Sequence, residues 1–262
     1  MTMKSLWTAA SGMAAQQTNM DVIANNLANA NTVGFKRSRA NFEDMMYENT
    51  VAAGAQTSAG TTIPTGIQIG TGTKTTSVDK LFQQGSFTET DNPLDLAVQG
   101  NGFFQILRGS QQAYTRNGSF KVDQNGNVVD ASGYQLQPSI QVPKTAVTLS
   151  VDASGVFTAS DATGKVLQTS QIQLYNFPNP AGLQSVGQNY FIPTQASGEV
   201  SNALPGGPEG MGTILEGFLE SSNINVVDEM VNMILSQRTY EANSKVIKSA
   251  DEMLQMANNV VR

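Results

Sequence analysis

The segment NVVDEMVNMILSQRTYEANSKVIKSADEMLQMANNVVR, residues 225–262, decides the fold at the C-terminal end of the chain. An apolar residue recurs every seven positions and no proline interrupts the segment, so it predicts one long helix with a narrow apolar seam. Asn225 can cap this helix, and Asp228 and Glu229 fall in its first turn, where the helix dipole favours negative charge. The seam consists of Val226, Met233, Tyr240, Ile247, Leu254 and Val261.

The row expected beside this seam is mostly polar. It consists of Met230, Gln237, Ser244, Asp251 and Asn258. A helix with so thin an apolar stripe gains little by folding alone. We therefore expect it to pack against another helix, in the same chain or in another copy.

The N-terminal end carries a similar rhythm. Apolar and small residues alternate at spacings of four and three, which predicts a helix that packs against another helix. These positions are Leu6, Ala10, Met13, Gln17, Met20, Ala24 and Leu27. We expect Leu6, Met13, Met20 and Leu27 to make the contacts, with methionine filling imperfect gaps between helices.

The N-terminal helix runs into ANNLANANTVGFKR, residues 24–37. Asparagine suits a helix end that leads into a turn, because it adopts left-handed backbone conformations and offers both a donor and an acceptor. We expect Asn26 and Asn29 to serve in this way. Gly34 would permit the chain to reverse into Phe35, whose ring can anchor the connector that follows.

Between the two ends the pattern changes. Residues 49–73 carry no charge and are rich in threonine and glycine, which indicates an extended connector. Residues 81–192 alternate apolar and polar side chains, as in Leu94, Leu96 and Val98, and contain turn signals such as Asn125-Gly126, expected to form a type I′ turn. This part therefore predicts a domain of short strands.

The predicted fold class is α+β. Terminal helices of heptad type, residues 1–33 and 225–262, form a coiled-coil inner domain. A mostly antiparallel β domain, residues 77–208, is inserted between them. Residues 34–76 and 209–224 form the extended linker region.

Composition excludes most enzyme classes. The 262 residues include no cysteine and no histidine, which removes thiolate nucleophiles, cysteine-ligated zinc and the commonest general base. The net charge of −6 argues against nucleic-acid binding. The sequence has no apolar run long enough to predict a transmembrane helix, and the N-terminus lacks the pattern of a cleaved signal peptide. We expect no cofactor, metal or membrane-embedded segment.

Motifs that could carry chemistry have plainer explanations. GNGFFQ from Gly100 lacks the third glycine of a dinucleotide loop, and DQNGNV from Asp123 has its glycine in the wrong place for a calcium loop. Both are typical of hairpin turns. The basic cluster of Lys36, Arg37 and Arg39 indicates a solvated face or an interface contact, because no aromatic residues interleave with it.

One catalytic alternative stays open at this point. Glu89, Asp91 and Asp95 lie close together in the sequence and could act as paired acids of a periplasmic hydrolase with a β domain. Solvated acids near a turn are equally ordinary, because Asp91-Asn92-Pro93 favours a turn before the next strand.

Four long blocks resemble the flagellar basal-body rod and hook proteins of bacteria. The first is LWTAASGMAAQQTNMDVIANNLANANTVGFKRSRANFEDMMY and the last is SSNINVVDEMVNMILSQRTYEANSKVIKSADEML, with PLDLAVQGNGFFQI and YTRNGSFKVDQNGNVVDASGYQL between them. Two further phrases, AGAQTSAGTTIPTGIQIGTG and FPNPAGLQSVGQNYFIPTQASG, are similar to those of distal rod members. Hook and proximal rod members of the same family are the near alternatives.

This resemblance implies a structural subunit and no catalytic residue. Such a subunit would form a helical, tubular homopolymer that transmits torque as a drive shaft and encloses an export channel. The implied partners are other copies, proximal rod proteins, the hook protein, the P and L ring proteins and the flagellar type III export apparatus. The implied location is the basal body, reached by that apparatus. The Asn-rich segment, the linker and the C-terminal helix are implied to serve assembly.

Overall fold

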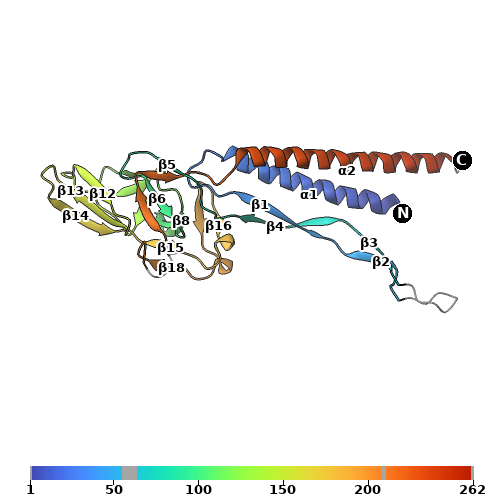
Figure 1. Ribbon diagram of the computed structural model, residues 1–262, viewed down its shortest axis with the longest axis horizontal. Helices are drawn as coiled ribbons and strands as arrows, with labels where there is room; N and C mark the ends of the chain where they lie inside the picture. Colours follow the sequence, from blue (N-terminus) through green and yellow to red (C-terminus); the bar gives the residue numbers. More distant parts are fainter. Residues whose placement is uncertain (1, 55–63, 208–210, 261–262) are drawn as a thin grey trace. The chain divides into compact units, whose positions relative to one another are not determined.

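The computed structural model describes residues 2–54, 64–207 and 211–260, which form an α+β fold (Figure 1). The chain divides into two compact units. Unit 1 comprises Met1–Ala28, Ser38–Asp79 and Asn225–Arg262, and unit 2 comprises Asn29–Arg37 and Lys80–Ile224. The sequence-based division into inner domain, linker and outer domain concerns roles in a polymer and stays a prediction.

Unit 1 pairs two helices, α1 (Thr2–Ala28) and α2 (Val226–Val260), which run in opposite directions (Figure 1). Asn225 caps α2 as predicted, because its Oδ1 accepts a hydrogen bond of 3.1 Å from the amide of Val227. Within the described residues, no helix is long and apolar enough to cross a membrane.

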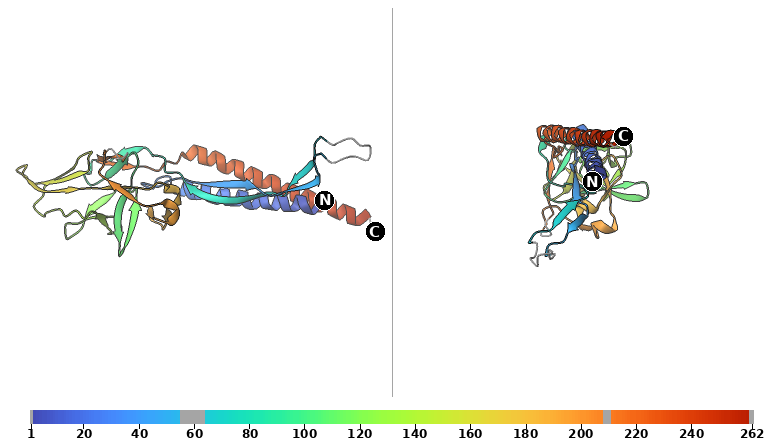
Figure 2. Two further views of the ribbon diagram at one scale, coloured as in Figure 1. Left: turned by 90° about the horizontal axis from the view of Figure 1, so that it is seen from below. Right: turned by 90° about the vertical axis from the view of Figure 1, so that its right-hand side faces the viewer.

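A two-stranded arm completes unit 1. Its strands are β1 (Ser38–Asp44), β2 (Tyr47–Val51), β3 (Ile67–Gly70) and β4 (Thr73–Lys80), with β1 beside β4 and β2 antiparallel to β3. The arm runs along α1, where β1 contacts the helix (Figure 2).

The arm includes part of the predicted connector. The uncharged stretch contains β3 and the end of β2, so the described part of it includes paired strands, which the sequence analysis did not anticipate. Pairing is favourable because alternating β-branched residues, such as Ile67 and Ile69, suit a pleated strand. Residues 55–63 of the predicted connector lie outside the described residues.

Unit 2 is built from antiparallel strands, as predicted. Among its described residues, one sheet contains, in spatial order, β16 (Gln184–Ser185), β17 (Tyr190–Ile192), β8 (Gln111–Thr115), β7 (Phe104–Arg108), β11 (Gln135–Gln137), β10 (Val128–Asp130) and β9 (Phe120–Val122). A second contains β12 (Thr148–Val151), β13 (Val156–Ser160) and β14 (Val166–Gln171). Three pairs complete the unit: β5 (Phe87–Glu89) with β20 (Phe218–Glu220), β6 (Leu96–Gln99) with β19 (Thr213–Glu216), and β15 (Leu174–Asn176) with β18 (Ser201–Ala203). Single 3-10 turns lie at η1 (Pro180–Gly182) and η2 (Gln195–Ser197).

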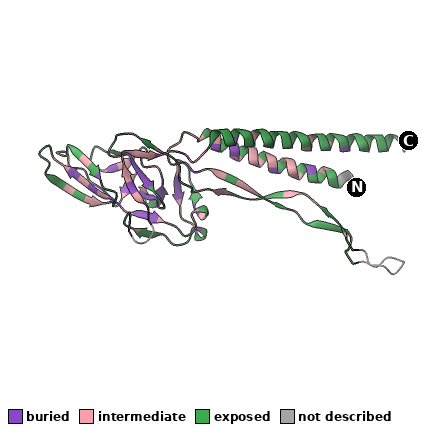
Figure 3. Ribbon diagram, in the orientation of Figure 1, coloured by how far each residue is buried: buried purple, intermediate pink, exposed green. Residues whose placement is uncertain are grey.

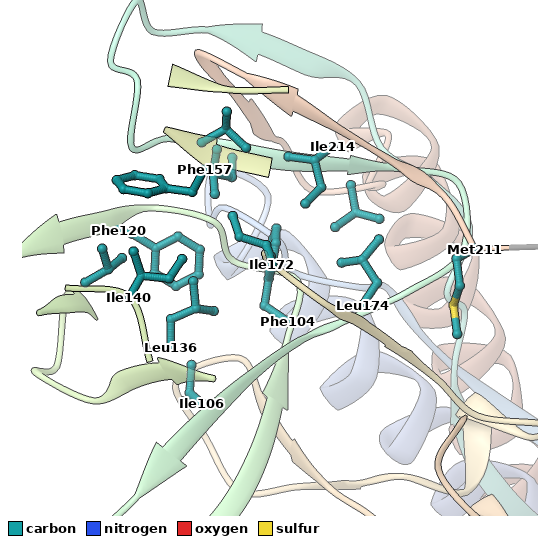
Figure 4. Packing of buried hydrophobic residues seen from close by; sticks show 14 of the residues in the cluster. Phe104, Ile106, Phe120, Leu136, Ile140, Phe157, Ile172, Leu174, Met211 and Ile214 are labelled. Atoms are coloured by element: carbon teal, nitrogen blue, oxygen red, sulfur yellow. The ribbon is translucent and has the colours of Figure 1, made fainter. Parts of the chain in front are cut away.

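The core of unit 2 comes from the inward positions of these strands (Figure 4). Phe104 and Phe120 meet edge to face, with ring centroids 5.3 Å apart. Leu96 and Val98, two of the residues predicted to alternate inward, are both buried in this cluster. Burial of apolar surface stabilises a fold by about 25 cal/mol per Å², so this cluster gives unit 2 a hydrophobic core of its own.

One predicted turn has a different geometry. A type I′ turn needs positive φ at both central residues, but at Asn125-Gly126 only Gly126 is positive, at +86°. The Gly126 amide donates to the Asp123 carbonyl, and the Asp123 amide donates to the Asn127 carbonyl. The turn is tight, as expected, but it uses glycine alone for the left-handed position.

Tyr190 provides a test of the packing in unit 2. Its hydroxyl donates to the Asp130 carboxylate, and burial, followed by that interaction, raises the pKa of Tyr190 to about 12. A raised tyrosine pKa contributes stability below about pH 10 that is lost as the pH rises from about 10 to about 12.

We therefore expect Tyr190→Phe to lose about 1 kcal/mol of unfolding free energy at pH 8. The difference from the unsubstituted protein should shrink towards pH 12, as measured by urea unfolding. Asp130 keeps its bonds from the amides of Ser132 and Tyr134, at 2.8 and 3.0 Å, so the turn should survive. A difference that stays constant from pH 8 to pH 12 would contradict this assignment.

Candidate assembly surfaces

The contact between α1 and α2 is built from polar and small residues. Three layers repeat every seven residues on each helix. Asn19 donates to the Ser236 hydroxyl at 2.8 Å and Asn26 donates to the Glu229 carboxylate at 3.4 Å, while Gly12 faces Asn243 so closely that a side chain added there would lie 2.9 Å from the amide nitrogen. Each buried polar contact contributes about 1 kcal/mol net. Among the described residues of unit 1, the buried apolar side chains are Ala9, Ala15, Ile23 and Ala250, so the helix pair combines these polar layers with a small apolar core.

These layers correct the row expected beside the seam of α2. Glu229, Ser236 and Ala250 are buried, whereas Met230 is 52% exposed and Gln237, Asp251 and Asn258 are also exposed. The buried residues Glu229, Ser236 and Ala250 lie three residues after Val226, Met233 and Ile247 rather than four, and Ser244 of the expected row is half-buried.

The predicted seam residues of α2 lie to differing depths in unit 1. Met233 and Ile247 are half-buried, while Val226, Tyr240 and Leu254 are exposed. Val261 lies outside the described residues. A continuous coiled-coil core along α2 is therefore not seen in the single chain.

On α1, the predicted contact residues Leu6, Met13, Met20 and Leu27 are all half-buried. The intervening Ala10, Gln17 and Ala24 are exposed. The buried positions are instead Ala9, Ala15, Ile23 and Asn26. This helix is more enclosed than α2, because it packs against both α2 and the arm (Figure 3).

The opposite face of α2 carries what we call the outer patch. It is an uncharged cluster on the first turns of the helix, and each member is between 49% and 67% exposed. Exposed apolar clusters of this kind mark surfaces that another molecule covers. The outer patch consists of Val227, Met230, Val231, Ile234 and Leu235.

Sequence reasoning missed the outer patch, although a signal was present. Val227, Val231 and Ile234 are spaced four and three apart, which is the same rhythm as the seam. The seam, which repeats every seven residues over the whole segment, indicated only one face of the helix. A second apolar face confined to three turns is easily hidden by it.

A groove lies on the other side of unit 1, between α1, the arm and α2. We call it the arm groove. Its volume is about 780 Å³, and its lining is mostly apolar. Beside it, Trp7 is exposed on α1 and Lys4 pairs with Glu48 of the arm. Its apolar lining residues include Ala9, Ile67, Ile69 and Val246.

The Asn-rich segment, residues 24–37, holds the first residue of the arm in place through hydrogen bonds. Asn26 is buried, and its side chain makes two hydrogen bonds with the backbone of Ser38, donating to the carbonyl at 2.8 Å and accepting from the amide at 2.9 Å. Asn29 forms the turn that follows α1, because the Thr32 amide donates to its carbonyl. Asn29 lies in the predicted turn, whereas Asn26 lies inside α1 and acts through its side chain. No asparagine of residues 24–37 has the left-handed backbone expected of it, and the assembly role of both residues stays a prediction.

Gly34 and Phe35 lie inside unit 2. Gly34 has a φ of +69°, and an added Cβ would lie 2.7 Å from the amide nitrogen of Asn117, so the position requires glycine. Phe35 is buried, with the Lys80 ammonium 4.7 Å from its ring centroid. Gly34 thus has the left-handed backbone expected of a reversal, and the assembly role of Gly34 and Phe35 stays a prediction.

Next to Phe35 lies a buried charge network that sequence reasoning missed. The Lys36 ammonium lies 2.6 Å from one oxygen of Glu220, and the Arg116 guanidinium lies 3.4 Å from the other. The side chains of Lys36 and Glu220 have no exposed surface. Burial lowers the pKa of Lys36, and the charge of Glu220 opposes that shift. Lys36 is therefore not part of a solvated basic face.

No sequence signal pairs these three residues, because the fold brings them together from distant positions. Glu220 also accepts from the Gly85 amide at 3.0 Å, and Arg116 donates to the carbonyls of Val98 and Gly100. The network links the segment after α1 to β20 and to the residue that follows β8. The network therefore has a structural role, because it joins three segments of unit 2.

The candidate catalytic acids lie in different environments. Asp95 is buried and its backbone takes part in turns, whereas Glu89 and Asp91 are exposed. In the part of the chain that the structure describes, no group of three acidic side chains could hold a metal ion.

Comparison with known families agrees with the helical ends and the inserted β unit. Residues 6–36 match the family of flagella basal body rod proteins, residues 97–159 the D1 domain of flagellar hook protein FlgE/F/G, and residues 215–260 the C-terminal region of flagellar basal body rod FlgEFG proteins. The class defined by these matches is that of the flagellar rod and hook proteins.

Relatives in other bacteria narrow the class. The flagellar basal-body rod protein FlgG of Caulobacter vibrioides is 47% identical over 98% of this chain and 99% of its own length. FlgG of Buchnera aphidicola from Schizaphis graminum is 46% identical over 96% and 97%. The hook protein FlgE of Helicobacter mustelae matches only 52% of this chain and 30% of its own length. The chain belongs to the family of flagellar basal-body rod proteins FlgG.

The predicted resemblance to this family, and within it to the distal rod members, is confirmed. The chain is a structural subunit of the flagellar rod, located at the basal body, and its relatives are structural proteins rather than enzymes. The hydrolase alternative is therefore set aside.

Proposed function

We propose that the chain polymerises into the tubular drive shaft of the distal rod, which transmits torque from the motor to the hook. The observation that carries this proposal is the outer patch of α2. The helix pair of unit 1 places polar residues inside and leaves apolar residues such as Ile234 facing water. Covering the outer patch with a neighbouring subunit would supply the apolar burial that one chain lacks.

In this proposal the terminal helices of many copies form a coiled-coil layer that encloses an export channel. The half-buried seam residues of both helices would complete their burial there. The remaining partners are proximal rod proteins, the hook protein, the P and L ring proteins and the type III export apparatus. Family membership supports these partners only in general terms.

The predicted assembly residues then divide into two groups. Asn26, Gly34 and Phe35 are buried within the subunit, so they would support assembly indirectly by fixing the fold. The seam residues, such as Met233 and Ile247, are open enough to meet another copy. Hook and proximal rod roles are less well supported, because the rod relatives match over nearly their whole length.

Deleting residues 225–262 tests this function. Unit 2 carries its own core, so we expect it to stay folded, as judged by near-ultraviolet circular dichroism. The truncated chain should form no polymer, and it should not restore swimming to cells that lack the full-length protein. Polymers and swimming that survive the deletion would contradict the proposal.

A further inference from the structure

The two apolar surfaces of unit 1 are complementary in shape and chemistry. We propose that the outer patch of one copy seats in the arm groove of a second copy, an inference that rests on the proposed function. The outer patch is convex, because it lies on one helix, and the arm groove is concave, because it lies between three elements.

Most of the surface that lines the arm groove is apolar, which suits an aliphatic occupant. Its wall combines Ile67 and Ile69 of β3 with Ala9 of α1 and Val246 of α2, and uncharged polar side chains lie among them: Ser5, Thr8, Thr50 and Asn243. The charged residues of its lining, Lys4 and Glu48, pair with each other. The outer patch itself carries no charge, and Arg238, one turn further along the same face of α2, pairs with Glu241, so the patch can enter without adding an unpaired charge. Side chains such as Val231 and Ile234 offer the branched apolar groups that fill such a space.

A copy cannot fill its own groove. The outer patch ends at Leu235, and the first residue of α2 that lines the groove is Asn243, further along the same continuous helix. Residues on one helix keep a fixed spacing of about 1.5 Å per residue, so the two surfaces never meet within one chain. Contact between the outer patch and the arm groove therefore has to join two copies.

This arrangement is head to tail. Each copy offers one patch and one groove, so the contact joins two different surfaces and leaves both ends of a pair open for further copies. Val231, at the middle of the outer patch, and Val246, in the groove, are separated by about 22 Å on a straight helix. If the α2 helices of contacting copies are parallel, we expect an axial offset of about that size.

Disulfide trapping tests which surfaces meet, because the chain contains no cysteine. The double variant Ile234→Cys with Ile69→Cys should form a ladder of cross-linked multimers when its polymers are oxidised. A matched control, Lys245→Cys with Ile69→Cys, places the first cysteine on an exposed part of α2 beyond the outer patch and should form none. Polymers of the first variant that do not cross-link, or equal cross-linking in both, would overturn the proposal.

A charge exchange keeps the test decisive if the cysteine variants fail to polymerise. Ile234→Glu alone should block polymerisation. If the two positions meet, adding Ile69→Lys should lower the critical concentration at least tenfold from that of Ile234→Glu alone. No restoration, together with no cross-linking, would overturn the proposed pairing. If the unsubstituted chain does not polymerise, the proposed function itself is contradicted.

Discussion

Glu220→Gln is expected to lower the unfolding free energy of unit 2 by about 3–5 kcal/mol, a large fraction of the stability of a domain. The substitution preserves shape but leaves the ammonium of Lys36 and the guanidinium of Arg116 buried without a counter-charge. An uncompensated buried charge is costly because the interior cannot solvate it as water does. Urea unfolding followed by near-ultraviolet circular dichroism measures the loss.

Two comparisons separate this effect from a general loss of charge. Glu89→Gln removes an exposed carboxylate from the strand paired with β20, so its effect should stay within about 0.5 kcal/mol. Lys36→Met should cost less than Glu220→Gln, because Glu220 would keep its contact with Arg116. Equal stability of Glu220→Gln and Glu89→Gln would show that the charge network does not hold the fold together.

The helices and the strand alternation were predictable because each depends on local pattern. The cap at Asn225, the buried alternation of Leu96 and Val98, and the reversal at Gly34 all follow from residue type and spacing. Such features need no knowledge of distant parts of the chain.

Features that join distant segments were not predictable in this way. The pairing of Lys36 with Glu220 spans most of the sequence, and the correct second row of α2 depends on which side chains of α1 it meets. The strand β3 was hidden for a related reason, because its partner Tyr47–Val51 lies outside the uncharged stretch for part of its length. Tertiary context decided each of these points.

Ile234→Glu is the second substitution with a large expected effect. In the single chain Ile234 faces water, so its replacement by glutamate, a good helix former, should leave the fold of the subunit unchanged. In the polymer the same position would be covered by another copy, where an unpaired carboxylate costs several kcal/mol. We expect the critical concentration for polymerisation to rise at least about a hundredfold.

The matched control is Asn232→Glu, which adds the same charge to an exposed position in the same turns of α2 but outside the outer patch. It should polymerise nearly as well as the unsubstituted chain. Circular dichroism of both variants should show equal helix content, which separates loss of assembly from loss of folding.

The most direct measurement is the critical concentration of the Ile234→Glu and Asn232→Glu proteins, determined by sedimentation of their polymers. If the subunit polymerises through the exposed face of α2, we expect the Ile234→Glu protein to stay in the supernatant and the Asn232→Glu protein to sediment. If Ile234→Glu sediments as readily as Asn232→Glu, the outer patch is not an assembly surface.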